Sequence, residues 1–339
     1  MASPFDNVTT PLSKVSQLKA TDPRESVGFM SLLLVKKIAD KTAKNGAPYL
    51  VVVFGDKTGE FATTIFSDTP YFPFFKTEAP EGSVVLLTGT TAYYQERFSP
   101  KVADLRKLSA TEQKDYPVHE LVDASSENPI AMWDELMAFV GKIQNEKLRQ
   151  TVLKAFEEVG EKFKSHPAAR AMHHAYRHGL LEHTLHVCRA AEALLPLYKE
   201  IHADLVRAGT ALHDIGKVIE FDYEMTTKYS KLGVLHGHVV IGYRIARAAA
   251  LKVGLDAQLL ERLEHIILSH QGELAFGAAA RAATPEAVFV SLVDNLDAKM
   301  GAVQNALRMG GESDAFTDVI PALGSKILLE PVRETPDAK

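Results

Sequence analysis

The stretch LVRAGTALHDIGK, residues 205–217, decides the fold class of the larger part of this 339-residue chain. Its apolar residues have helical spacing and lead directly into His213 and Asp214, and Gly216 is typical of a helix end. Because the chain leaves its helix here, the two polar side chains can converge on one site. A single His-Asp pair also occurs by chance, so its meaning depends on the residues around it.

Histidine is concentrated in the same region, where 12 of the 13 histidines lie between His166 and His270. Several of them continue stripes of apolar residues that recur every three or four positions and therefore face a helical core. A carboxylate on such a stripe is costly to desolvate unless a cation or hydrogen-bond donors compensate it. The side chains that this pattern selects are His183, His213, Asp214, His238, His270 and Asp294.

Imidazoles and carboxylates on the inner faces of separate helices are how a helical bundle builds a metal site. The mixture suits a divalent transition metal. The alternative at each position is a hydrogen-bonded core histidine with an aspartate partner, and the joint pattern favours the metal. Six of the remaining histidines are interpreted as surface residues, packing residues or partners of the ligands, with His174 and His265 closest to a ligand role. These are His173, His174, His178, His186, His202 and His265.

The N-terminal part of the chain has a different texture. Residues 1–27 read as an irregular segment, whereas 28–110 hold short apolar or alternating runs that are separated by turn residues such as Asn45-Gly46. Asn-Gly between two apolar runs predicts a tight hairpin. Five such strands, with a helical piece near 68–76 between the third and the fourth, favour a Greek-key barrel of the OB type over other small β-domains.

The sequence therefore predicts a multidomain α+β protein in which an N-terminal OB-fold β-barrel precedes an all-α helical bundle. A polar linker is expected at 111–130, the helical domain at 131–308, with a helix that starts at Thr284-Pro285, and a loosely ordered tail at 309–339.

Composition excludes several classes of protein. The net charge of −5 argues against a histone-like polycation. Cys188 is the single cysteine, which excludes an internal disulfide and fits a reducing compartment. No apolar run approaches the roughly 18 residues that span a bilayer, and no signal peptide is evident. We therefore expect a cytoplasmic protein without membrane partners.

Five motifs in order carry a resemblance to a known family. They are HHAYRHGLLEHTL at 173–185, LHDIGK at 212–217, GHVVIG at 237–242, ILSHQGELAFG at 267–277 and DNLDAKM at 294–300. Their order resembles the signature of the HD-domain metal-dependent phosphohydrolases, and more closely the YhaM-type 3′-to-5′ exoribonucleases, which join an OB-fold to an HD domain. The segment KTAKNGAPYLVVVFGDKTGEF at 41–61 resembles the OB part, so the resemblance covers about residues 28–307.

The resemblance implies a hydrolase that degrades single-stranded RNA, with DNA as a further substrate, to mononucleotides through a metal-activated hydroxide. It implies two divalent ions, manganese first, with cobalt, iron, nickel, zinc and magnesium as alternatives. One ion would be bound by His183, His213, Asp214 and Asp294, and Asp214 would bridge to a second ion held by His238 and His270. Gln271 stands where relatives often carry a second histidine, which leaves open whether it alters the metal count.

Two further sets of residues are assigned roles. Asp214 and Lys217 are the candidate catalytic residues, because Lys217 lies about one helical turn beyond the bridge and could reach a phosphate oxygen. The alternative for Lys217 is a solvated lysine at a helix end. In the β-domain, Lys57, Tyr94 and Arg97 are the candidates for binding a single strand by stacking and charge, whereas Phe54, Phe61 and Phe66 are expected in the core.

Alternative functions remain open at this point. One is an HD-domain nucleotide or cyclic-nucleotide phosphohydrolase, and the other is a non-catalytic accessory protein that binds single strands. A homo-oligomer is also left open.

Overall fold

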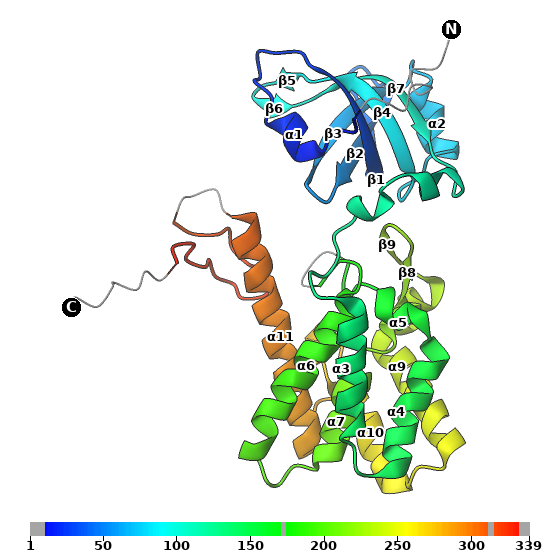
Figure 1. The fold of residues 1–339 in the computed structure, drawn as a ribbon, viewed down its shortest axis with the longest axis vertical. Coiled ribbons are helices and arrows are strands. Elements are labelled where there is room, and N and C mark those ends of the chain that lie inside the picture. The colour runs from blue at the N-terminus through cyan, green and yellow to red at the C-terminus, as the bar shows by residue number, and fades with distance from the viewer. Residues whose placement is uncertain (1–10, 171–173, 311–314, 332–339) are drawn as a thin grey trace, which may run out of the picture. The chain divides into compact units, whose positions relative to one another are not determined.

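A computed structural model describes residues 11–170, 174–310 and 315–331 (Figure 1). The chain divides into two compact units. The first runs to Asp123 and includes Glu224–Thr226, and the second holds the rest of the chain from Ala124. The first unit is an OB-like antiparallel sheet and the second is mainly helical, which confirms the predicted fold class.

Five antiparallel strands form the sheet of the first unit, in the order β3-β2-β1-β4-β7. Strand β1 (Gly28–Thr42) pairs with β4 along its first half and with β2 along its second, and the register shifts between Val35 and Lys37. An irregularity of this kind bends a strand and increases its twist. The five-stranded sheet in this non-sequential order is therefore compatible with the partly open barrel of an OB-fold. The other strands are β2 (Pro48–Asp56), β3 (Gly59–Phe66), β4 (Val84–Thr90) and β7 (Lys101–Lys107).

The predicted reversal at Asn45-Gly46 connects β1 to β2, and Gly46 has the positive φ of 84° that favours glycine. Phe54 and Phe61 are buried as expected, but Phe66 is 57% exposed, so the prediction for Phe66 was wrong. The reason is the two-residue period of β3, which places Phe66 on the same solvent-facing side as Glu60.

Smaller elements complete the first unit. Helix α1 (Val15–Lys19) lies inside the segment read as irregular, and Val15 is buried there. The segment read as a linker contains η1 (Glu112–Asp115) and η2 (Val118–Glu120), and Leu121 is buried. The other elements are α2 (Tyr71–Thr77) and the hairpin of β5 (Tyr93–Tyr94) with β6 (Arg97–Phe98).

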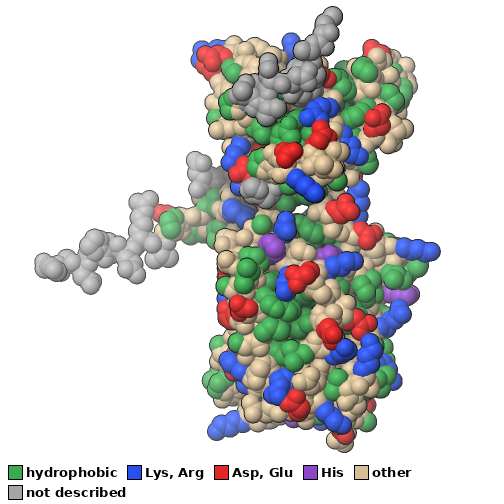
Figure 2. All heavy atoms as spheres, turned by 45° about the vertical axis from the view of Figure 1, so that its right-hand side comes forward, with side chains coloured by type: hydrophobic (Ala, Val, Ile, Leu, Met, Phe, Trp, Pro, Cys, Tyr) green, Lys and Arg blue, Asp and Glu red, His purple; other side chains and the backbone are tan. Residues whose placement is uncertain are grey.

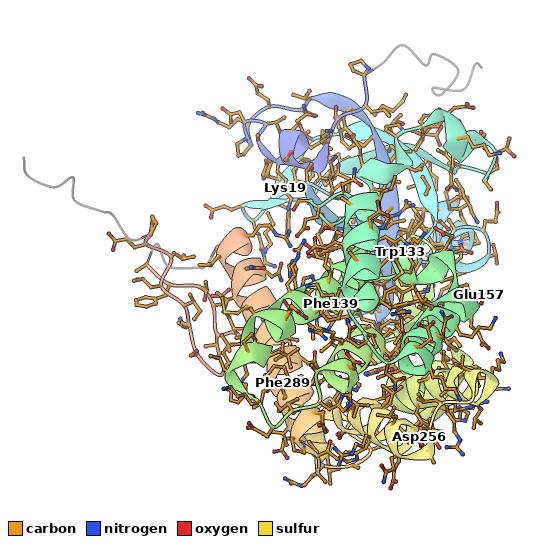
Figure 3. The ribbon with its side chains drawn as sticks, turned by 60° about the horizontal axis from the view of Figure 1, so that its bottom comes forward. Lys19, Trp133, Phe139, Glu157, Asp256 and Phe289 are labelled. Carbon is orange, nitrogen blue, oxygen red and sulfur yellow. The ribbon has the colours of Figure 1, made fainter. Side chains whose placement is uncertain are left out.

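The helices of the second unit surround one hydrophobic core, to which Trp133, Phe139 and Phe289 in Figure 3 contribute. The helices are α3 (Pro129–Gly141), α4 (Glu146–Val159), α5 (Glu161–Ser165), α6 (Gly179–Leu194), α7 (Ala203–Leu212), α8 (Lys217–Glu220), α9 (Lys231–Val253), α10 (Ala257–Ser269) and α11 (Pro285–Met309), with the 3-10 helices η3 (Leu195–Leu197) and η4 (Leu274–Phe276).

Local signals explain most of the helix ends. The Thr284 side chain accepts a hydrogen bond from the Ala287 amide and Pro285 is the first helical residue of α11, as predicted. Gly160, at φ 56°, separates α4 from α5. The hairpin of β8 (Phe221–Tyr223) and β9 (Thr227–Tyr229) was not predicted, because strands of three residues are too short to show a periodicity.

Charged side chains of both signs are interleaved on the face shown in Figure 2, in line with the small net charge of −5. Within the described part of the chain, no helix combines the length and the apolar character needed to cross a membrane.

Candidate metal centre

Helix ends and one close backbone approach position the predicted ligands in the second unit. His213 is the C-cap of α7, with Asp214 next to it, and His270 is the C-cap of α10. The turn after Asp214 packs directly against α9, since a Cβ at Gly216 would lie 2.0 Å from the backbone oxygen of His238. Glycine at this position therefore allows Asp214 and His238 to approach each other.

A kink in α9 orients His238. Gly237 has a non-helical φ of 66°, and the amide of His238 donates to Oε1 of Glu220 across 3.0 Å. Nδ1 of the same ring lies 3.0 Å from Oε2 of Glu220. The buried Glu220 thus holds both the backbone and the ring of His238.

All four candidate histidines use Nδ1 in the same way. The pairs are His183 with Asp297 at 2.7 Å, His213 with the Thr210 carbonyl at 2.8 Å, His238 with Glu220 at 3.0 Å, and His270 with the Ile267 carbonyl at 2.7 Å. Carbonyl and carboxylate oxygens accept hydrogen bonds, so each Nδ1 carries a hydrogen. In a neutral ring the lone pair is then left on Nε2, the arrangement typical of metal-binding histidines.

The Nε2 atoms of two of these rings meet at the first cluster. Nε2 of His183 lies 3.1 Å from Nε2 of His213. The same atom lies 3.3 Å from Oδ2 of Asp214 and 3.2 Å from Oδ1 of Asp294. Two nitrogen lone pairs this close repel each other unless a proton or a metal ion lies between them.

The second cluster shares Asp214 with the first. Oδ1 of Asp214 lies 3.5 Å from Nε2 of His238 and 3.5 Å from Nε2 of His270. Asp214 is 2% exposed, and its Oδ1 has no hydrogen-bond partner among the described residues. The two oxygens of one buried carboxylate therefore face two different groups of imidazoles.

The residues present fit divalent cations. Ligand bonds of about 2.0–2.2 Å place neighbouring donor atoms roughly 3–3.5 Å apart, close to the separations observed in both clusters. A cation would also satisfy Oδ1 of Asp214. The clusters His183, His213 and Asp214, and Asp214, His238 and His270, could each hold a metal.

The electrostatics of the first cluster favour positive charge. Burial alone would lower the pKa of His183, but hydrogen bonds with Asp214, Asp294 and Asp297 outweigh burial and hold this pKa well above its ordinary value. Burial lowers the pKa of His213 to about 4. Burial would raise the pKa of Asp294, but its hydrogen bond with His183 and nearby imidazoles bring it to about 2. The carboxylates are thus ionised, and without a metal a proton on His183 balances part of their charge.

Lys217 lies inside the same site. Its Nζ donates to Oδ2 of Asp214 across 2.5 Å, and Lys217 is only 8% exposed, so it is not a solvated lysine. Gln271 also reaches the centre, because its Nε2 lies 3.0 Å from Nε2 of His270 and 3.3 Å from Nε2 of His238.

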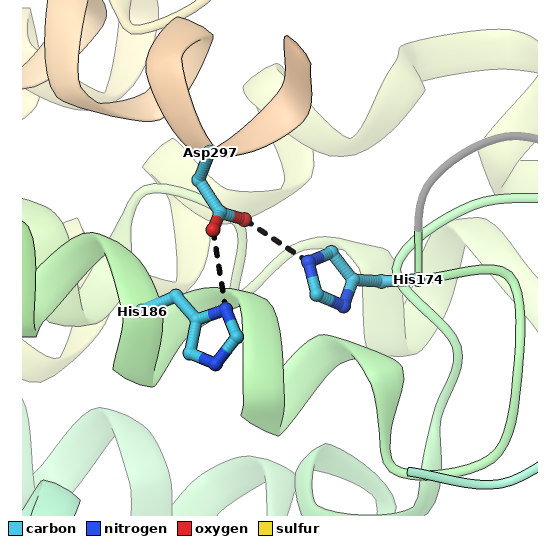
Figure 4. Close-up of side chains that lie close together, drawn as sticks. All are labelled: His174, His186 and Asp297. Atoms are coloured by element: carbon cyan, nitrogen blue, oxygen red, sulfur yellow. Dashed lines mark hydrogen bonds and ion pairs between the residues drawn. The ribbon is translucent and has the colours of Figure 1, made fainter. Parts of the chain in front are cut away.

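Sequence reasoning missed Asp297. It lies three residues after Asp294 in α11, on the same helix face, and this spacing is the signal that could have identified it. Asp297 contacts three imidazoles: His183, and the His174 and His186 rings drawn with it in Figure 4. His174 therefore lies beside the candidate ligands.

Three of the other histidines form hydrogen bonds with the backbone. Nε2 of His265 accepts from the Ala283 amide, and Nδ1 of His202 accepts from the Leu205 amide as the N-cap of α7. Nδ1 of His178 bonds to a backbone carbonyl. His173 lies outside the described residues.

The three candidates for nucleic-acid binding lie in the first unit. Tyr94 is 69% exposed and pairs with Arg97 across the β5–β6 hairpin. Lys57 occupies the β2–β3 turn, where it forms an ion pair with Glu120 at 3.3 Å. Tyr94 and Phe66 border a cavity of about 510 Å³, whose lining also includes Tyr71, Tyr93 and Lys101.

Comparison with known proteins agrees with this geometry. Residues 180–299 match the model of the HD domain and include all six predicted ligands. The 3′-5′ exoribonuclease YhaM of Geobacillus sp. (strain WCH70) is 29% identical over 300 residues, 88% of this chain and 91% of the relative. The protein of the same name from Shouchella clausii is 29% identical, over 88% of this chain and 92% of the relative.

Among solved structures, the mitochondrial single-stranded DNA-binding protein Rim1 of S. cerevisiae aligns with 25% of this chain and 96% of its own, at 16% identity and a TM-score of 0.21. The resemblance inferred from the sequence is confirmed: the chain carries an HD domain and is similar, over 88% of its length, to proteins named 3′-5′ exoribonuclease YhaM.

Proposed function

We propose that this chain is a metal-dependent exoribonuclease that hydrolyses single-stranded RNA from its 3′ end to mononucleotides, with single-stranded DNA as a further substrate. The named activity of its relatives supports this proposal. The structural observation that carries it is the convergence of four imidazole Nε2 atoms on the two oxygens of Asp214, in a buried site that Asp294 completes.

Two divalent ions, with manganese as the first expectation, fit the two clusters. One ion would be held by His183, His213 and Asp294. The other would be held by His238 and His270, and Asp214 would contact both ions. Divalent ions at such a site lower the pKa of a coordinated water towards neutrality and stabilise negative charge on phosphate oxygens.

The protein's own residues orient this chemistry. The hydrogen-bond acceptors at each Nδ1 fix the direction of the imidazole lone pairs. Asp214 keeps the two clusters a fixed distance apart because its carboxylate belongs to both. The buried ammonium of Lys217, next to Asp214, offsets negative charge that develops on the phosphate.

The first unit would supply a binding surface for the strand. Exposed rings can stack on unpaired bases without regard to sequence, and cationic side chains follow the phosphates. Tyr94 and Phe66 offer such rings beside one cavity that Lys101 also lines, and Arg97 lies on the same hairpin as Tyr94. Lys57, whose ammonium lies 3.3 Å from Glu120, is the third predicted contact.

The proposal is tested with a 5′-labelled oligoribonucleotide, manganese and the purified full chain. We expect a ladder that shortens one nucleotide at a time, release of mononucleotides, and loss of activity in chelator and in Asp214→Asn. Asp134→Asn, an exposed aspartate on α3, is the matched control and should retain activity.

Three other outcomes would overturn the proposal. Early 5′-labelled products of a few discrete lengths, in place of a progressive ladder, would indicate an endonuclease. Consumption of free or cyclic nucleotides with the RNA intact would indicate a nucleotide phosphohydrolase. Binding of the strand without any hydrolysis would indicate an accessory protein.

A further inference from the structure

Asp297 joins three imidazoles through one carboxylate. Its Oδ2 lies 2.7 Å from Nδ1 of His183 and 3.1 Å from Nε2 of His174, and its Oδ1 lies 3.2 Å from Nδ1 of His186 (Figure 4). These side chains come from α11, α6 and the loop before α6. The cluster borders the candidate metal centre through His183. The sequence did not single out Asp297, and it gave His174 and His186 only a general role as surface residues, packing residues or partners of the ligands.

The two outer imidazoles are engaged at both ring nitrogens. The second nitrogen of His186, Nε2, lies 3.3 Å from Oε1 of Glu127, which in turn forms a two-pronged ion pair with Arg189 at 3.0 and 3.1 Å. The second nitrogen of His174, Nδ1, lies 2.9 Å from the hydroxyl of Tyr176. Each ring nitrogen of His174 and of His186 therefore faces an oxygen atom.

This arrangement differs from that of the candidate ligands. In the metal centre, Nε2 of His183 and Nε2 of His213 face each other, which requires a cation or a proton between them. Around Asp297 the nitrogens face carboxylate or hydroxyl oxygens at hydrogen-bond distance, which neutral or protonated rings satisfy without a metal. His174, His186 and Asp297 could also be read as a metal group, but their contacts favour a hydrogen-bonded assembly.

We propose that Asp297 is a positioning residue for the metal centre. By accepting from Nδ1 of His183, it holds that ring in the tautomer whose lone pair lies on Nε2 and points at the first cluster. His174 and His186 hold the carboxylate of Asp297 in turn, so its side chain cannot rotate away. This inference rests on the proposed metal site, because its consequence is the strength of metal binding.

The test compares metal binding by metal-free full-length wild type, Asp297→Asn, His186→Ala and the exposed control Lys299→Ala, titrated with manganese in a calorimeter. An outer partner of a metal-binding histidine typically contributes about 10- to 100-fold in affinity. We expect a loss in that range for Asp297→Asn, a smaller loss for His186→Ala and none for Lys299→Ala. Far-ultraviolet circular dichroism of each variant shows whether it folds.

A second measurement does not depend on the metal. In metal-free protein with ¹⁵N-labelled histidine, at a pH high enough for the His183 ring to be neutral, the ring shifts of His183 should report a hydrogen on Nδ1 in the wild type. The Asp297→Ala variant should lose this preference. Unchanged affinity in Asp297→Asn together with an unchanged His183 tautomer in Asp297→Ala would overturn the positioning role.

The remaining outcomes separate the two proposals. If the wild type binds no manganese, the metal centre fails, whereas the tautomer measurement still decides whether Asp297 orients His183. If the wild type binds three equivalents and His186→Ala binds two, the cluster is itself a metal site, and the positioning role is overturned.

Discussion

The ammonium of Lys217 donates a hydrogen bond to Oδ2 of Asp214 across 2.5 Å, and both residues are at least nine-tenths buried. In the metal-free protein this cation compensates a carboxylate that faces the imidazoles of both clusters. Lys217 therefore stabilises the site before any metal is bound. Its removal should affect the metal-free protein most.

We expect Lys217→Ala to lower the free energy of unfolding of the metal-free protein by about 3–5 kcal/mol, because breaking a buried pair leaves the remaining charge uncompensated. Manganese should restore part of the loss, since the metal takes over that compensation. Urea unfolding in chelator and in manganese measures both effects. Lys231→Ala, at an exposed position of α9, is the control. Identical midpoints for the two variants would contradict the prediction.

The amide of Gln271 lies against the second cluster, with its Nε2 3.3 Å from Nε2 of His238 and 3.0 Å from Nε2 of His270. When these rings are neutral this amide donates to their nitrogens, and it would have to leave them before a metal binds. We expect Gln271→Ala to bind the second manganese equivalent about 2- to 10-fold more tightly, since a hydrogen bond is worth about 0.5–1.5 kcal/mol. Calorimetric titration measures this, with Gln258→Ala as the control. Weaker binding in Gln271→Ala would show instead that the amide oxygen serves as a ligand.

Metal binding should strengthen as the pH rises. Burial alone would lower the pKa of His183 and of His270, but the neighbouring carboxylates outweigh burial and raise both above the ordinary value of about 6.5. Both rings therefore keep a second proton at pH values at which a free imidazole has lost it. Protonation of such a ring stabilises the metal-free fold. This contribution is fully present at pH values below the pKa of the ring in the unfolded chain, and it is lost as the pH rises through the pKa of the ring in the folded protein. The metal requires the deprotonated rings.

The rise in melting temperature caused by manganese should therefore grow between pH 6 and pH 8.5, as should the number of protons released on binding. Thermal unfolding with and without manganese across this range measures the first quantity, and calorimetry in buffers of different ionisation enthalpy the second. A manganese effect that is constant with pH would contradict the assignment of these histidines as ligands.

Gly216 should not tolerate a side chain. A Cβ at this position would lie 2.0 Å from the backbone oxygen of His238 and 2.6 Å from the amide nitrogen of Gly242. We expect Gly216→Ala to destabilise the fold by roughly 1–3 kcal/mol, towards the upper end because backbone atoms must move, and to weaken manganese binding. Gly141→Ala is the control, since nothing lies within 4 Å of its Cβ. Equal stability of the two variants would show that the turn can move away from α9.

Tyr94 should contribute to binding of the strand. Stacking of one base on an aromatic ring is worth about 1–3 kcal/mol, so Tyr94→Ala should weaken binding of single-stranded RNA correspondingly, without changing manganese affinity. Fluorescence anisotropy of labelled RNA in chelator measures binding without hydrolysis. Tyr198→Ala, a partly exposed tyrosine of the second unit, is the control. Equal RNA affinities would exclude the β5–β6 hairpin from the interface.

The sequence by itself determined the two-part architecture, the hairpin at Asn45-Gly46 and the start of α11 at Thr284-Pro285, because turn residues and helix caps act locally. It also selected His183 and Asp294 among many polar residues, since apolar periodicity shows which face of a helix is buried. These properties depend on neighbours within a few positions of the chain.

Only the tertiary structure decided which atoms meet. Asp294 and Asp297 lie on one face of α11, yet the first faces the imidazole nitrogens of the centre and the second supports His183 from behind. Lys217 bonds to Asp214 and not to solvent because the turn at Gly216 packs tightly against α9. Contacts between segments far apart in the chain depend on backbone approach and on side-chain direction, and neither follows from periodicity.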